Sequence, residues 1–164
     1  MKITILAFGK LKTPGLREAA DYYLKLIQPW IEVRELELKP IELKDKSPEN
    51  RKIVQSKESQ ILLKEFQKLP HPSAIIFLDE KGKPLSTQQW KNEMENFMQS
   101  GIKTILICIG SSIGFDESLK HHVKLKISLG PQTLSHELAR TVLVEQLYRT
   151  WSVMKGHPYH VEGS

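Results

Sequence analysis

Short apolar runs alternate with amphipathic helical stretches along this chain, and the alternation repeats about five times. The runs at residues 2–8, 74–78 and 104–109 are rich in Ile and Leu, which is typical of buried strands. Residues 31–38 and 123–129 alternate apolar and polar side chains, as half-buried strands do. This order predicts an α/β fold, with a Rossmann-like, mostly parallel sheet and helices on both of its faces.

The helical stretches carry start signals. Thr13-Pro14 fits an N-cap followed by a first helical proline. A second helix is expected over residues 48–68, with Ile53 among its inward-facing side chains. Ser86–Gln89 fits a capping box. Ser135 is expected to cap a last long helix that reaches about Lys155.

Size and composition are those of a globular protein of 164 residues. We expect a single domain over residues 1–160, followed by a tail over residues 161–164. The net charge of +5 raises the odds of a polyanionic partner, but by itself it is more simply explained by a solvated surface with a few extra lysines. The single cysteine, Cys108, lies in an apolar run and is expected to be a buried thiol. With neither a signal-peptide pattern nor a membrane-spanning run in the sequence, a cytoplasmic protein is expected.

Ligands of open α/β sheets bind beyond the carboxyl ends of the strands. Three such ends stand out here: Leu78-Asp79, Ile109-Gly110 and Leu129–Leu134. A charged turn is expected over Asp79–Lys83. The glycines let a ligand approach the backbone, but Gly110 and Gly114 also fit a simple tight turn.

Several motifs of well-known enzyme classes do not occur in the sequence. Neither the G-x-G-x-x-G nor the P-loop pattern occurs, which disfavours an NAD enzyme and a P-loop NTPase. The H-E-x-x-H and G-x-S-x-G patterns are also missing, which disfavours a zincin and an α/β-hydrolase. No metal is expected, because neither the His121-His122 pair nor the lone cysteine has further ligands at metal-binding spacing.

The last helix and the C-terminal segment carry the remaining candidates. His136 and Arg140 are four residues apart at the helix start, beside the Leu129–Leu134 loop. They fit a ligand site or a solvated helix end. Glu145 and Arg149 have the spacing of a helix-stabilising ion pair. The segment His157–His160 is aromatic, and its rings could stack on RNA bases.

Several segments occur in an order and spacing that match a known family: Met1–Lys10, Leu78–Lys83 with Leu85-Ser86, Thr133–His136, Val144–Arg149 and Gly156–His160. Together they resemble the RlmH family of SPOUT-class enzymes, which methylate N3 of a pseudouridine in 23S ribosomal RNA of the large subunit. The resemblance covers essentially the whole chain.

The resemblance implies S-adenosyl-L-methionine (SAM) as methyl donor, a homodimer, a C-terminal trefoil knot, and 23S rRNA within an assembled ribosome as partner. It also implies that SAM contacts the knotted loops. By matching segments, the expected cofactor-binding residues are Leu78, Gly110, Leu129, Gly130, Pro131, Gln132, Thr133 and Leu134.

The resemblance also suggests catalytic roles. His160 or His136 is expected to act as general base, and Tyr159 with His160 to contact the target base from the partner subunit. Arg140 or Arg149 is expected to hold a phosphate or stabilise the anionic base.

Two other function classes are left open. One is a SPOUT protein that binds RNA but is catalytically impaired. It would fit two departures from the family pattern, Ser111 where a second glycine is usual and Ser135 where a proline is usual. The other is a flavodoxin-like binder of a phosphate ligand, for which the sequence offers no phosphate-cradling loop.

Overall fold

A computed structural model describes residues 1–159 of the chain. Its five strands form one parallel sheet in the order β2-β1-β4-β3-β5. The elements, in chain order, are β1 (Lys2–Phe8), α1 (Leu16–Ile27), β2 (Glu32–Leu38), α2 (Pro48–Gln67), β3 (Ser73–Pro84), α3 (Thr87–Gln99), β4 (Thr104–Ile109), the 3₁₀ helix η1 (Glu117–His122), β5 (Leu125–Ser128) and α4 (His136–Met154).

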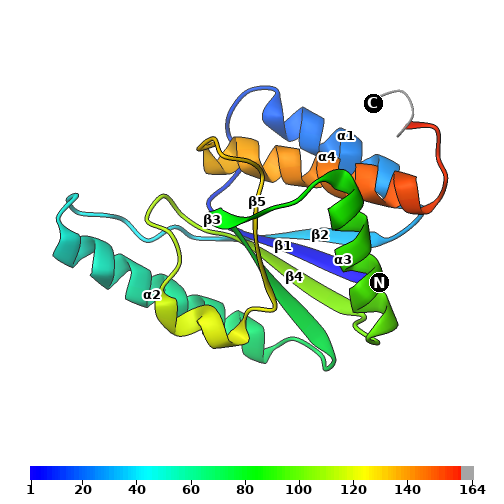
Figure 1. Ribbon diagram of the computed structural model, residues 1–164. Helices are drawn as coiled ribbons and strands as arrows, with labels where there is room; N and C mark the ends of the chain where they lie inside the picture. The colour runs from blue at the N-terminus through cyan, green and yellow to red at the C-terminus, as the bar shows by residue number, and fades with distance from the viewer. Residues whose placement is uncertain (160–164) are drawn as a thin grey trace.

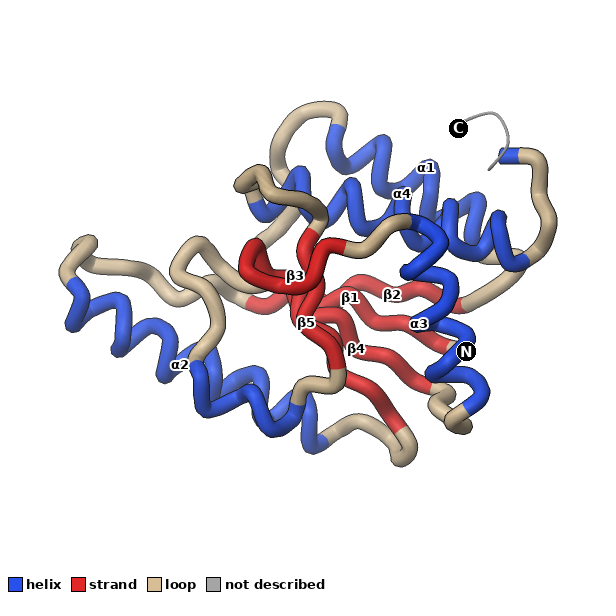
Figure 2. Tube along the Cα trace, viewed as in Figure 1, coloured by secondary structure: helices blue, strands red, loops and turns tan. Residues whose placement is uncertain are grey.

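Helices cover both faces of this sheet (Figures 1 and 2). Successive side chains of a strand point to opposite faces, so Ile3 and Ile5 enter one core and Leu6 enters the other. The first core is completed by α1, α3 and α4, and the second by α2 and η1. The predicted α/β architecture with a parallel sheet and two helical layers is confirmed.

The last two strands of the sheet are paired in an unusual way. Leu78 and Lys83 of β3 both pair with Ile127 of β5, with an irregularity between them. A Cβ atom built on Gly82 would lie 2.4 Å from the carbonyl carbon of Ile127, so only glycine fits this approach of two backbones. The segment between Leu78 and Lys83 therefore folds closely around β5. Such an arrangement fits a threaded chain, and the trefoil knot itself stays a prediction.

Three local predictions are wrong. The first helix begins at Leu16 after Gly15, because the Thr13 hydroxyl is bound to Glu137 of α4 and does not cap α1. Ile53 is 52% exposed, since α2 turns another row of side chains toward the sheet. The charged stretch Asp79–Lys83 continues β3 instead of forming a separate turn.

The predicted caps are confirmed. The Gln89 amide donates to the Ser86 hydroxyl at 3.2 Å, and the Ser86 amide donates to the Gln89 side chain at 2.8 Å. Ser135 accepts from the Leu138 amide at the start of α4. Cys108 is fully buried, as expected. Within residues 1–159, no helix has the length and apolar character needed to cross a membrane.

Candidate functional site

The three predicted strand ends meet around one cavity of about 440 Å³, within the size range of small-molecule sites. It is open at the carboxyl edge of β3, β4 and β5, where an α/β sheet binds its ligands. Seven of the expected cofactor-binding residues line it: Leu78, Gly110, Leu129, Gly130, Gln132, Thr133 and Leu134. Pro131 belongs to the same loop but is exposed and lies outside the lining.

The loop that follows β5 is tied to the end of β3. The Thr133 hydroxyl donates to a Glu80 carboxylate oxygen at 3.0 Å. Within the loop, the Ser128 hydroxyl accepts from the Gly130 amide at 3.1 Å and donates to the Gly130 carbonyl at 2.6 Å. These bonds fix two walls of the cavity relative to each other.

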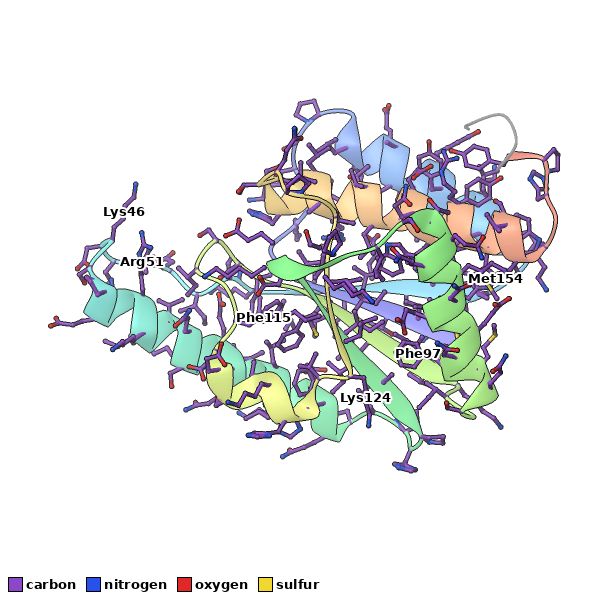
Figure 3. The ribbon with its side chains drawn as sticks, viewed as in Figure 1. Lys46, Arg51, Phe97, Phe115, Lys124 and Met154 are labelled. Atoms are coloured by element: carbon purple, nitrogen blue, oxygen red, sulfur yellow. The ribbon has the colours of Figure 1, made fainter. Side chains whose placement is uncertain are left out.

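The loop that follows β4 is held by an aromatic contact. Phe115, which is labelled in Figure 3, lies on the side of the loop that faces the sheet. Its ring stacks on Phe77 of β3, with ring centroids 3.8 Å apart and planes at 16°. A Cβ on Gly110 would come within 3.1 Å of the Phe115 ring. The small size of Gly110 therefore lets this ring cover the end of β4.

Helix α2 also reaches this loop, which the sequence analysis missed. The Gln55 side-chain amide donates to the Ile113 carbonyl at 2.7 Å. The Ser111 hydroxyl donates to the Glu58 carboxylate at 2.9 Å. A signal was present in the sequence, because Glu58 lies four residues after Val54, on the inward row of α2.

The structure separates the candidate catalytic residues. His136 lines the cavity at the first position of α4. Arg140, one turn later, is 3% exposed and forms ion pairs of 2.6 Å with both Glu35 and Glu37 of β2. Arg140 does not line the cavity, and its charge is already matched by two carboxylates.

Tyr159 and Arg149 lie together farther along α4. The Tyr159 ring packs 4.6 Å from that of Tyr148, and the Arg149 guanidinium lies 4.8 Å over it. Arg149 also forms the predicted ion pair with Glu145, at 2.8 Å. The Tyr159 hydroxyl donates to Glu145 at 3.1 Å. Burial, followed by the Tyr23 hydroxyl and the Glu145 carboxylate, raises the pKa of Tyr159, so this hydroxyl stays protonated at neutral pH.

His136 and Tyr159 lie at different points along α4. Its 19 residues span about 28 Å at 1.5 Å per residue. His136 is at one end of this span, whereas Tyr159 packs beside Glu145 and Tyr148, about halfway along it. Tyr159 does not line the cavity of its own chain, which α4 reaches only with His136 and Ala139. His160, the other candidate base, lies outside the described residues.

Residues 1–159 contain no group of three His, Cys, Asp or Glu side chains placed to hold a metal ion. The polar groups around the cavity are instead hydroxyls, amides, backbone and single charges, among them Ser111, Thr133 and Gln132. Such a lining suits an organic ligand that has both polar and apolar parts.

Comparisons with known proteins point in one direction. Residues 1–160 match a family model described as "Predicted SPOUT methyltransferase". Relatives named "Ribosomal RNA large subunit methyltransferase H" from Streptococcus pneumoniae strains CGSP14, 70585 and JJA are each 33% identical to this chain over 162 residues. The match covers 98% of this chain and 99% of each relative. The resemblance found from the sequence motifs is thereby confirmed.

Proposed function

The chain belongs to the SPOUT methyltransferase family, and from that premise we propose that it methylates N3 of a pseudouridine in 23S ribosomal RNA, with SAM as methyl donor. The observation that carries the proposal is the cavity that the ends of β3, β4 and β5 form together. The printed name of the relatives, which span nearly the same length, supports ribosomal RNA as the substrate class.

The lining of this cavity fits SAM. Leu78, Leu129 and Leu134 offer apolar walls for the flat adenine ring, and Gln132 and Thr133 offer an amide and a hydroxyl for the polar parts of SAM. A Cβ on Gly114 or Gly130 would meet no other atom within 4 Å, which leaves the backbone accessible there. Asp79, Glu80 and Lys126 supply charge for the amino acid part of the molecule.

When bound, SAM supplies a methyl group on a sulfonium centre, so the protein's main task is orientation of the acceptor. N3 of the base carries a proton that must leave, and a general base within hydrogen-bond reach would remove it. We assign this role to His136, which lines the cavity, or to His160. Tyr159 is no candidate for the base, because its hydroxyl stays protonated beside Glu145.

We further propose that the active form is a homodimer. Because Tyr159 packs on Glu145 and Tyr148, outside the cavity lining of its own chain, its C-terminal segment is available to complete a site on a second copy. Arg149 lies beside Tyr159 and keeps part of its surface exposed, so it is better placed than Arg140 to meet an RNA phosphate. The proposed place of action is the cytoplasm, on an assembled ribosome.

Methyl transfer from labelled SAM to ribosomes that lack the modification tests this proposal. The expected result is incorporation into 23S rRNA at one nucleotide, mapped as an N3-methylated pseudouridine. Free 23S rRNA, run in parallel, distinguishes the naked RNA from the assembled ribosome as substrate. SAM binding without any incorporation into either substrate would instead favour an RNA-binding protein that is catalytically impaired.

A further inference from the structure

Two side chains of α2 hold the loop that follows β4. Gln55 donates to the carbonyl of Ile113, and Glu58 accepts from the hydroxyl of Ser111. Ser111 and Ile113 both line the proposed SAM cavity, as does Gln55 itself. Helix α2 therefore touches the cofactor site through hydrogen bonds that join segments more than fifty residues apart.

Glu58 is an unusual residue for its position. It is 5% exposed and lies on the row of α2 that faces the sheet, four residues from Val54 and four from Leu62. Burial raises the pKa of this carboxyl, and the hydrogen bond from Ser111 opposes that rise. A buried carboxyl needs a polar partner to be tolerated. Within the part of the chain that the structure describes, the Ser111 hydroxyl is that partner.

The loop itself offers little else to fix its shape. The Gly114 amide donates to the Ser111 carbonyl at 3.0 Å, which closes one turn, and Phe115 anchors the far end on Phe77. The rest of the loop consists of Gly110 and Gly114 at its two ends and an exposed Ser112. A loop that is already ordered before binding saves the ligand the free energy of ordering it.

Building on the proposed function, we propose that Gln55 and Glu58 are positioning residues, which hold the Gly110–Gly114 loop from α2 in the shape that binds SAM. Serine at position 111 is then a functional part of this chain, because it supplies the hydroxyl that Glu58 requires. Helix α2 thereby sets the affinity for the methyl donor without contributing to methyl transfer.

Three variants test this proposal: Gln55→Ala, Ser111→Ala and the conservative Ser111→Thr. Gln60→Ala is the matched control, since Gln60 is an exposed glutamine of the same helix. Calorimetry gives the dissociation constant for SAM, and methyl transfer gives KM for SAM and kcat separately. Amide hydrogen exchange over residues 110–115, without any ligand, reports on the loop alone.

We expect Gln55→Ala and Ser111→Ala each to weaken SAM binding about 5- to 10-fold, the worth of one lost hydrogen bond. KM for SAM rises together with the dissociation constant, and kcat at saturating SAM stays within about 2-fold of wild type. The amide hydrogens of the loop exchange faster. Ser111→Thr, which keeps the hydroxyl, and Gln60→Ala stay close to wild type. A general loss of folding would lower the melting temperature and kcat together.

Unchanged SAM affinity and unchanged loop exchange in both alanine variants would overturn the proposal. A fall in kcat with no change in KM would overturn it as well. Gln55→Ala keeps the test valid should Ser111→Ala fail to fold, because Gln55 is only half-buried. Failure of the wild-type protein to bind SAM would refute the proposed function instead, and the exchange measurement would still decide whether α2 orders the loop.

Discussion

Two variants that are each inactive are expected to restore methyl transfer when their subunits are mixed. His160→Ala removes a group from the C-terminal segment, and Gly130→Leu disrupts the cavity, because leucine rarely adopts the φ of +135° found at Gly130. Tyr159, the neighbour of His160, lies outside the cavity lining of its own chain, whereas Gly130 belongs to that lining. In a dimer that exchanges C-terminal segments across its axis, the intact cavity of one subunit meets the intact segment of the other.

The size of the recovery follows from counting sites. Random exchange makes about half of the dimers mixed, and each mixed dimer has one intact site of two, so about a quarter of wild-type activity should return. The chain that carries both substitutions, mixed with an equal amount of wild type, is the control. It should also leave about a quarter of the activity, against about half if the segment served its own subunit.

The assay is initial-rate transfer of labelled methyl to unmodified ribosomes, after mass spectrometry has verified that subunits exchanged. Calorimetry on each variant checks that His160→Ala binds SAM and Gly130→Leu does not. Recovery no greater than the summed activities of the two variants, with mixed dimers present, would refute the reasoning. The C-terminal segment would then not act across a dimer.

Three further predictions concern stability. Gly82→Ala forces a Cβ to within 2.4 Å of the Ile127 backbone. It should therefore lower the free energy of unfolding, measured in urea, by about 2 kcal/mol or more. The neighbouring variant Lys83→Ala should lower it little, and equal effects of the two variants would contradict the close approach. Hydrogen bonds from the Lys12 amide and from Thr13 lower the pKa of Glu137 to about 2. The ionised Glu137 therefore stabilises the fold above its ordinary pKa of 4.5, and this contribution is lost as pH falls toward 2. The melting temperature measured against pH should fall less steeply in acid for Glu137→Gln than for the wild type, and parallel curves would refute the assignment. Arg140→Leu leaves Glu37 without its cation, so it should lower the free energy of unfolding by about 3 kcal/mol while SAM binding stays unchanged. If the variant instead weakened RNA binding at unchanged stability, Arg140 would be a phosphate contact after all.

The sheet could be predicted from the sequence because its signals are local. The apolar run of β4 and the alternation in β2 need no knowledge of the rest of the chain. The general rule for α/β sheets then places a ligand at the carboxyl ends of the strands. The cavity at the ends of β3, β4 and β5 agrees with that expectation.

The remaining features depend on what lies opposite a residue, which periodicity does not contain. Helical spacing puts His136 and Arg140 on one side of α4, yet one residue meets the cavity and the other meets β2. Glu58 could be recognised as an inward-facing acid, but its partner Ser111 lies 53 positions away. The double pairing of Ile127 with β3 is likewise a long-range contact with no local signature.

The contribution of the β5–α4 region to the cavity also determines when a binding site first exists during synthesis. The segments that end β3 and β4 are made early, but the third wall comes from the loop after β5 and the first turns of α4. Proteins are synthesised from the N-terminus, and domains fold as units. A nascent chain that stops before β5 therefore presents an open sheet edge at β3 and two isolated loops. Occupancy by the methyl donor should thus report completed folding, and ligand-dependent protection during translation should appear only once α4 has emerged.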